Sequence, residues 1–419
     1  MSNYNYVYYT AQINNDGSKS PTNYTNEEPN LEFKEDRKVP IIQNTEEYMM
    51  AVESAMFDLK TLPVFIPTIK YNNDSPTNIQ RLETIYEVTL EFDGMAATVP
   101  VYFTPQDETL FDTPPSFING VANYKTGYYN LYNYEFFFTA VNEAIRNAMI
   151  LLIPTIRSYN GTLPTAFSNL ATSGHYEIPY FIFDKESSLI FLNSPTKTFD
   201  STNTAFISIY LNKPLYRLFN SLPFILQNKT LNILDSTSTQ TTTTKTLFKL
   251  NLSNFKQANE VEIFAHLSND TSATIKSTHL LIYQDYETLS SWSPVESIVL
   301  ISPNFPVPSH QMSASLEYLD GMINQLGNER TEQEILEVEN HTPVPYVLYE
   351  PKQFRWMHLK QSDSDNMRQI LFKVFYRYKL NGDLIPVKAG IGGSFSVKLM
   401  FKKNQIICLK KFKISYIYI

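Results

Sequence analysis

The run from Gln369 to Lys402 constrains the fold more than any other part of the sequence. It reads as an extended segment, the pair Asn381-Gly382, a second extended run, a glycine cluster and a final extended segment. Asn-Gly between extended runs predicts a tight β-hairpin, because both turn positions tolerate positive φ. Apolar residues alternate with polar ones in the first and last segments: Phe372, Val374, Tyr376, Tyr378 and Leu380, then Phe395, Val397, Leu399 and Phe401. This alternation is typical of half-buried strands and predicts one wall of a β-sandwich.

Other segments repeat the pattern of strand and turn. Leu82–Phe92 alternates, and Asp93-Gly94 predicts a hairpin with Ala96–Phe103. Tyr176–Phe191 indicates a second hairpin, and Ala205–Leu211 a further strand. Many short strands separated by turn signals favour a mainly β protein, a sandwich or jelly roll, over an α/β fold.

One segment has a clear helical period. Glu135–Leu152 places six apolar residues on one face: Val141, Ala144, Ile145, Ala148, Met149 and Leu152. Pro154 is expected to end this helix. The amphipathic helix at about 135–152 is therefore predicted to pack on the core within a mixed region of the chain.

Composition and charge exclude several classes of protein. The net charge of −8 over 419 residues gives no general nucleic-acid footprint. The single cysteine, Cys408, allows no intrachain disulfide and no zinc cluster. The N-terminal residues lack the pattern of a secretory signal, so we expect synthesis inside a cell without secretion. Charge is uneven, with an acidic stretch at 329–339 and a basic one at 405–419.

No catalytic constellation emerges. The six histidines have no metal-ligand spacing, and the chain has neither a GxSxG nor a Walker A motif. Asp285 with Glu287, or Glu83 with Glu87, would supply paired carboxylates, but solvated strand faces explain both pairs. The two tryptophans, Trp292 and Trp356, are more simply core residues than a sugar platform in so aromatic a chain. We predict no catalytic residue, no metal site and no cofactor.

Three stretches resemble a known family. Ile207–Pro223, Ser291–Leu300 and Tyr378–Phe401 are similar, in order, to the minor capsid or penton proteins of Polinton-type elements, adintoviruses and polinton-like viruses. The resemblance implies a jelly-roll domain that forms a homopentamer at icosahedral capsid vertices. It also implies a double-jelly-roll major capsid protein as partner, and a location in the virion.

The polar composition of residues 1–40, the charge of the C-terminal residues and this resemblance together give the expected domain organisation. We expect an extended or disordered N-terminal arm at 1–40 and a jelly-roll capsid domain at 41–404. The domain is long enough to contain an inserted region at roughly 105–340, and 405–419 forms a basic tail whose partner would be DNA or an internal membrane. The Ser/Thr run Ser236–Thr246 is expected to be an exposed loop tip.

Two other functions remain open on the sequence. The chain would be a receptor- or glycan-binding β-sandwich if Ser236–Thr246 and neighbouring loops formed a contact face for a host receptor. It would be a hydrolase only if acids such as Asp285 and Glu287 converged on one cleft.

Overall fold

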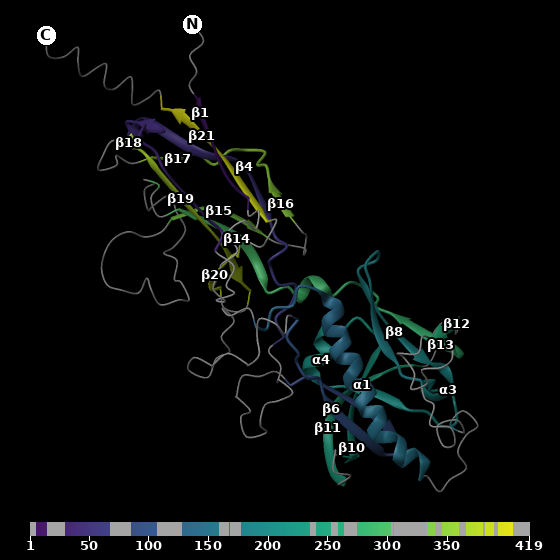
Figure 1. Cartoon of the computed structure of the whole chain (residues 1–419). Helices are drawn as coiled ribbons and strands as arrows, with labels where there is room; N and C mark the ends of the chain where they lie inside the picture. The colour runs from purple at the N-terminus through teal and green to yellow at the C-terminus, as the bar shows by residue number, and fades with distance from the viewer. Residues whose placement is uncertain are drawn as a thin grey trace, which may run out of the picture. The chain divides into compact units, whose positions relative to one another are not determined.

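A computed structural model describes 15 segments of the chain. They are 6–14, 30–67, 85–106, 128–158, 167, 177–234, 240–252, 259–263, 275–302, 305, 333–339, 346–359, 366–379, 382–388 and 393–404. The chain divides into two compact units (Figure 1). Unit 1 comprises Met1–Val64 and Ser293–Ile419, and unit 2 comprises Phe65–Trp292.

Unit 1 is an eight-stranded jelly roll made of two four-stranded antiparallel layers. The first layer has the order β1 (Tyr6–Asn14), β21 (Ser394–Lys403), β4 (Tyr48–Asp58) and β16 (Tyr346–Tyr349). The second has the order β15 (Gln333–Glu339), β14 (Val295–Ser302), β19 (Gln369–Tyr378) and β2 (Glu32–Asp36). Short strands add to both: β17 (Met357–His358) pairs with β4, and β20 (Leu384–Pro386) pairs with β19. A separate pair joins β3 (Ile42–Gln43) to β18 (Asn366–Met367), and a short 3-10 helix, η1, covers Thr45–Glu47.

The core of unit 1 lies between the inner faces of the two layers. Phe57 of β4 packs on Phe395 of β21, with ring centroids 5.4 Å apart. Phe33 of β2 contacts both Tyr9 of β1, across the sandwich, and Phe372 of β19, within its own layer. Interdigitated aromatic side chains of this kind hold two sheets together and bury the apolar half of each strand. The expected mainly β, jelly-roll fold is therefore confirmed.

The C-terminal strands confirm one expectation and contradict another. β19 turns into β20 at Gly382, whose φ is 77°, so the predicted hairpin is present. β21, however, lies in the other layer, between β1 and β4 (Figure 1). The last segment of the predicted ribbon thus crosses the sandwich instead of extending one wall.

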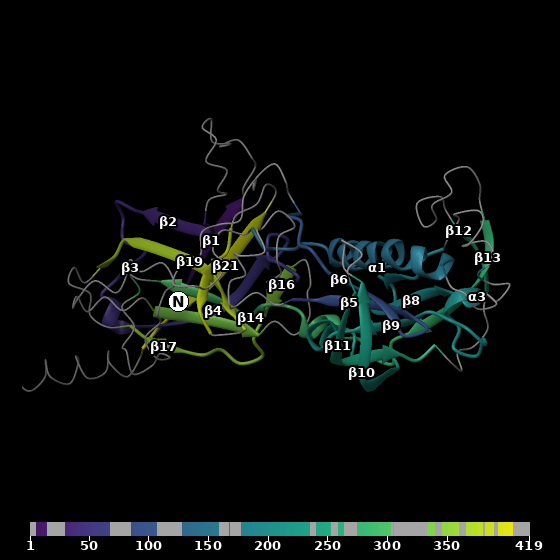
Figure 2. The ribbon, with the colours of Figure 1, turned by 90° about the horizontal axis from the view of Figure 1, so that it is seen from below.

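The N-terminal arm needs a correction. Residues 1–40 were expected to be extended or disordered, but Tyr6–Asn14 forms strand β1 and pairs with β21 along its full length. Glu32–Asp36 forms β2, beside β19 (Figure 2). Tyr9 and Ala11 are buried, because alternate residues of β1 point into the sandwich. The strand was not predicted because the segment is polar in composition, although one face of β1 is buried.

Unit 2 contains a closed barrel and a separate sheet. The barrel has the order β10 (Phe224–Leu234), β11 (Gln240–Leu250), β9 (Ser208–Leu211), β5 (Glu87–Phe92) and β6 (Met95–Pro100). The sheet has the order β12 (Asn259–Ile263), β13 (Ile275–Tyr283), β8 (Leu189–Pro195) and β7 (Tyr180–Asp184). Three short helical segments complete the unit: α3 (Thr196–Phe199), α4 (Lys213–Leu218) and the 3-10 helix η6 (Leu289–Ser291). Both predicted hairpins, β5–β6 and β7–β8, are confirmed.

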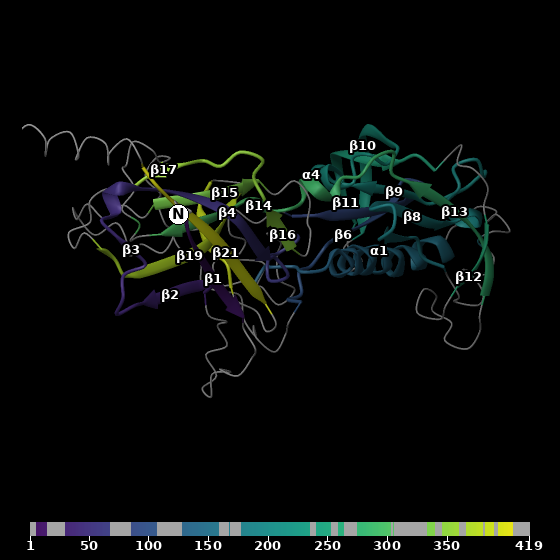
Figure 3. The same ribbon diagram turned by 90° about the horizontal axis from the view of Figure 1, so that it is seen from above.

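The predicted helix is longer than expected. α1 spans Tyr134–Arg157 and packs beside β5, β6 and β7. Figure 3 shows the helix next to β6. Pro154 lies inside its last turn, not beyond it, and is exposed. The apolar face continues to Ile156, and its burial outweighs the one hydrogen bond that proline removes. α1 has the length and hydropathy of a bilayer-spanning segment, but half of its apolar window is already buried within the protein, as in an ordinary core helix.

The insertion boundaries at 105 and 340 are wrong. Unit 2 begins at Phe65 and ends at Trp292, so in the sequence it follows strand β4 and precedes strand β14 of the jelly roll. β5 and β6 therefore belong to the barrel, while β14 and β15 belong to the jelly roll. The sequence offers no sharp change of composition at either junction.

Candidate interaction surfaces

One outer face of the jelly roll carries apolar side chains in water. The layer β1-β21-β4-β16 buries alternate residues, and the intervening residues face outward. Tyr8 on β1 is 54% exposed, and Tyr346 and Leu348 on β16 are 64% and 57% exposed. Tyr6 and Phe354 are also exposed. Together these five side chains form what we call the aromatic face, a surface typical of protein contacts.

Lysine side chains hold part of the aromatic face in place. The Lys398 ammonium lies 5.2 Å from the centre of the Tyr8 ring. The Lys402 ammonium lies 5.7 Å from both the Tyr6 and the Trp356 rings. Cation–π contacts of this kind contribute about 0.5–1 kcal/mol each at exposed sites. They favour this arrangement of the rings, which lowers the cost of ordering them when a partner binds.

The barrel of unit 2 turns its charged residues inward. Glu91 is buried, and its carboxylate lies 2.7 Å from the Lys229 ammonium and 3.2 Å from the Tyr210 hydroxyl. Lys245 pairs with Glu87 at 3.3 Å. Lys249 lies over the ring of Phe206, and burial lowers the pKa of its ammonium. Strand alternation places these side chains on the inner surface of β5, β9, β10 and β11.

The outer surface of the same two strands, β10 and β11, is uncharged. It consists of two rows of side chains that we call the threonine face: Asn228, Thr230 and Asn232 on β10, and Thr242, Thr244 and Thr246 on β11. Each row member bonds to its partner across the ladder. Thr230 and Thr244 share a hydrogen bond of 2.9 Å, Thr242 donates to Asn232 at 2.9 Å, and Thr246 donates to Asn228 at 2.6 Å.

The threonine face corrects the expectation of a loop tip at Ser236–Thr246. Gln240–Thr246 is part of β11 and pairs with β10, while 235–239 lies outside the described residues. Threonine is β-branched and favours strands, and cross-strand threonine pairs stabilise a sheet. Low sequence complexity was therefore misleading here, because the run alternates between a polar outer surface and a barrel interior.

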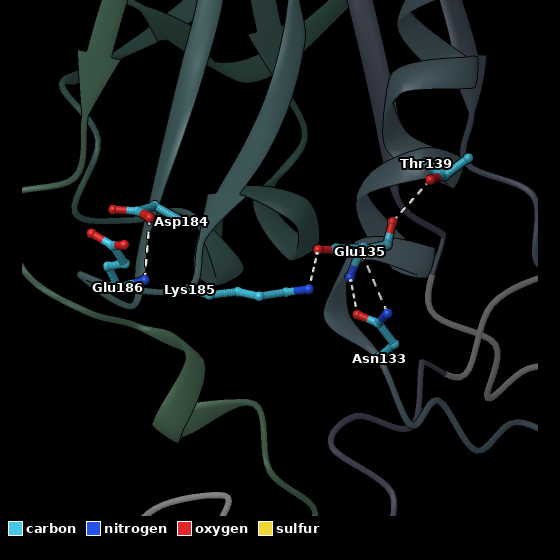
Figure 4. A network of polar contacts seen from close by, with 6 residues as sticks. All are labelled: Asn133, Glu135, Thr139, Asp184, Lys185 and Glu186. Carbon is cyan, nitrogen blue, oxygen red and sulfur yellow. Dashed lines mark hydrogen bonds and ion pairs between the residues drawn. The ribbon is translucent and has the colours of Figure 1, made fainter.

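A polar cluster fixes the start of α1 (Figure 4). The Asn133 side chain accepts a hydrogen bond of 2.9 Å from the Glu135 backbone N–H and so caps the helix. Glu135 in turn pairs with Lys185, in the β7–β8 turn, at 2.9 Å. The hydrogen bond from Lys185 lowers the pKa of the Glu135 carboxyl. In Figure 4 Lys185 reaches from this turn to the helix, so the cluster joins the two elements and serves a structural purpose.

The one buried histidine with a described environment is also structural. His279 of β13 is fully buried, with Nδ1 2.5 Å from the Asn193 side-chain oxygen and Nε2 3.4 Å from the Glu177 carboxylate. Asn193 also donates to the Tyr180 hydroxyl at 2.7 Å. His358 is exposed on β17, and the other four histidines lie outside the described residues.

The acids considered for catalysis do not converge. Asp285 and Glu287 follow β13 in a turn instead of sharing a strand face, and Glu287 accepts a hydrogen bond from the Ser290 backbone. Glu87 pairs with Lys245 in the barrel, and Glu83 lies outside the described residues. Within the described segments no group of three His, Cys, Asp or Glu side chains is arranged to hold a metal.

The two tryptophans occupy different environments. Trp292 is buried in an aromatic core of unit 2, within 6 Å of five other rings: Phe65, Tyr134, Phe137, Phe138 and Phe219. Trp356 lies beside Lys402 and contacts Phe354 of the aromatic face. The prediction that both tryptophans are core residues is therefore confirmed for Trp292, whereas Trp356 belongs to a surface that sequence patterns did not reveal.

The chain is similar to two virion proteins of known structure. A chain in the 3.5 Å cryo-EM structure of the Sputnik virophage is 19% identical, with a TM-score of 0.66 over 96% of this chain and 98% of that one. The mavirus penton protein is 15% identical, with a TM-score of 0.51 over 95% of this chain and 99% of that one. At these identities the likeness establishes the fold. No curated protein sequence matches the chain.

The family is established by a match along nearly the whole sequence. The model of the Sputnik minor capsid protein V18/19 family matches residues 7–403, which include every strand of the jelly roll except the first residue of β1. The match also covers the whole of unit 2. The chain thus belongs to the Sputnik minor capsid protein V18/19 family, and it is a structural protein of a virion.

Proposed function

We propose that this chain is the penton protein of an icosahedral capsid and forms a homopentamer at each vertex. The observation that carries the proposal is the aromatic face of the jelly roll, which leaves Tyr8, Tyr346 and Leu348 in water in an isolated chain. A closed ring requires a heterologous interface, in which one surface of a subunit meets a different surface of the next. Aromatic side chains supply such contacts with few charges to desolvate.

The partners beyond the ring follow from the family. We propose that the pentamer is surrounded by a double-jelly-roll major capsid protein, because a penton must join the shell that it closes. No catalytic step is part of this function. The basic tail at 405–419, proposed to contact DNA or an internal membrane, lies outside the described residues.

The mass of the purified chain in solution tests the proposal. Light scattering after size-exclusion chromatography is expected to give about 242 kDa, five times the chain mass of 48.4 kDa. Tyr8→Ser combined with Leu348→Ser is expected to shift the mass toward that of a monomer. Lys34→Ser, at an exposed position on β2 of the other layer, is the matched control and should leave the pentamer intact.

Electron microscopy distinguishes the possible outcomes. Five-fold rings, alone or beside the major capsid protein, support the proposal. A strict monomer at high concentration that also fails to join particles formed with the major capsid protein contradicts it. Pentamers that survive the double substitution would show that the ring uses another surface.

A further inference from the structure

The threonine face has a distribution of charge that is the reverse of the usual one. Along β10 and β11 the lysines Lys229, Lys245 and Lys249 point into the barrel, while the outward rows carry hydroxyl and amide groups alone. In most surface strands charged residues face water, because burial of a charge is costly. Here that cost is offset in part by the pairs with Glu91 and Glu87. The outer surface is left neutral and polar.

The hydroxyl and amide groups of this face are held in fixed positions. The three cross-strand hydrogen bonds set the rotamers of all six side chains. In the bonds to Asn228 and Asn232 the threonine donates and the amide oxygen accepts. As far as the described residues extend, the amide N–H groups and several hydroxyl lone pairs therefore remain for a ligand. A strand spacing of about 4.8 Å and a rise of about 3.4 Å per residue make the array roughly 5 Å wide and 14 Å long.

An apolar platform adjoins the array. Leu226 continues the β10 row and is 61% exposed, and it pairs across the ladder with Phe248. The Phe248 ring stacks on Tyr216 of α4, with centroids 3.8 Å apart and planes at 6°. Both rings are half-buried and rigid, so they offer an edge and a surface at little entropic cost.

From this arrangement we propose that the threonine face binds a neutral glycan. Sugar rings present hydroxyl groups along their edges and C–H groups on their faces, which match the amide and hydroxyl rows and the Leu226–Phe248 platform, respectively. The absence of charge on the six side chains favours a neutral saccharide over a sulfated or sialylated one, since an anion would find no cation on this surface. The inference is independent of the pentamer, because it uses residues of unit 2 alone.

Binding of defined oligosaccharides by the full chain tests the inference. Chitohexaose, mannohexaose and maltohexaose serve as neutral probes and a heparin hexasaccharide as the anionic one, each titrated by calorimetry. We expect saturable binding of at least one neutral probe and none of the heparin probe. Thr244→Val and Thr246→Val remove a hydroxyl without loss of strand propensity, and each is expected to weaken binding by roughly five- to tenfold. Leu226→Ser should weaken it to a similar extent.

Thr10→Val provides a matched control, because Thr10 is an exposed strand threonine in unit 1. Tryptophan fluorescence, from Trp292 in unit 2 and Trp356 in unit 1, should report an unchanged fold for every variant. No saturable binding of any neutral probe up to 10 mM, or binding that all three variants leave intact, would overturn the inference. Heparin binding that Lys249→Gln abolishes would also overturn it, since the site would then bind anions through a lysine of the barrel. Loss of pentamers in the Thr244→Val or Thr246→Val chain, but not in Thr10→Val, would identify the threonine face as a protein contact instead.

Discussion

The aromatic core around Trp292 predicts how sharply unit 2 depends on a single ring. Phe137 of α1 is buried, and its ring lies 5.0 Å from Phe65, 5.8 Å from Tyr86 and 5.6 Å from Trp292, each in an edge-to-face arrangement. Truncation of a buried phenylalanine to alanine costs about 3–5 kcal/mol through lost transfer energy and the cavity left behind. Three aromatic contacts place Phe137→Ala near the middle of this range, at about 4 kcal/mol. Phe137→Leu keeps most of the volume and should cost about 1.5 kcal/mol.

The chain offers a direct assay, because each unit contains one tryptophan. In a Trp356→Phe background the remaining fluorescence reports on Trp292 and therefore on unit 2. With a urea m-value of about 2.5 kcal/mol/M, Phe137→Ala should lower the midpoint by about 1.5 M. Ile150→Ala, at a position of the same helix that is 45% exposed, is the control and should cost under 1 kcal/mol. If Phe137→Ala and Ile150→Ala shifted the midpoint equally, the proposed packing of α1 on the aromatic core would be refuted.

Three further predictions use the same fluorescence assay. Lys229→Met leaves the buried Glu91 carboxylate without its cation and should destabilise unit 2 by about 2 kcal/mol. This is less than the cost of breaking a fully buried ion pair, because the lysine side chain is a third exposed. Glu91→Gln in the same chain should restore part of the loss. Gly94→Ala should cost about 1 kcal/mol, because φ at this residue is +80°, although a Cβ placed there would meet no atom within 4 Å. An unchanged urea midpoint would show that the turn relaxes. The pKa of Glu135 is lowered in the folded state, so the stability that its carboxylate contributes is present above the unfolded value of 4.5 and is lost as the pH falls below it. The Glu135→Gln chain should therefore lose less stability than the wild type between pH 6 and pH 3.5. An equal loss would contradict the ion pair with Lys185.

Local signals in the sequence predicted local structure well. Asp93-Gly94 adopts positive φ at both residues and joins β5 to β6, as the pair predicts. The helical period found α1 because its buried face is continuous. These features depend on residues close together in the chain, and their physical causes are visible in any short window.

Features set by distant parts of the chain were not predictable. Nothing within Tyr6–Asn14 indicates that its partner is β21, almost the whole chain away. The run Ser236–Thr246 was mistaken for a loop because its alternation separates a solvent side from a barrel interior to which β10 and β9 contribute apolar residues such as Leu231 and Tyr210. The aromatic face was missed for a related reason: the same tyrosines suit a core equally well, and only the sheet register assigns them to the outside.

The position of β21 has a consequence for biosynthesis. This strand lies between β1 and β4, so β1 acquires its hydrogen-bonding partner only after all of unit 2 and the later strands of the jelly roll have been made. All the residues of unit 2 emerge before β21 does. We therefore expect unit 2 to be able to fold first, while the layer that carries the aromatic face closes only once β21 has emerged. The aromatic face would thus be incomplete during most of translation, which would keep nascent subunits from associating with one another.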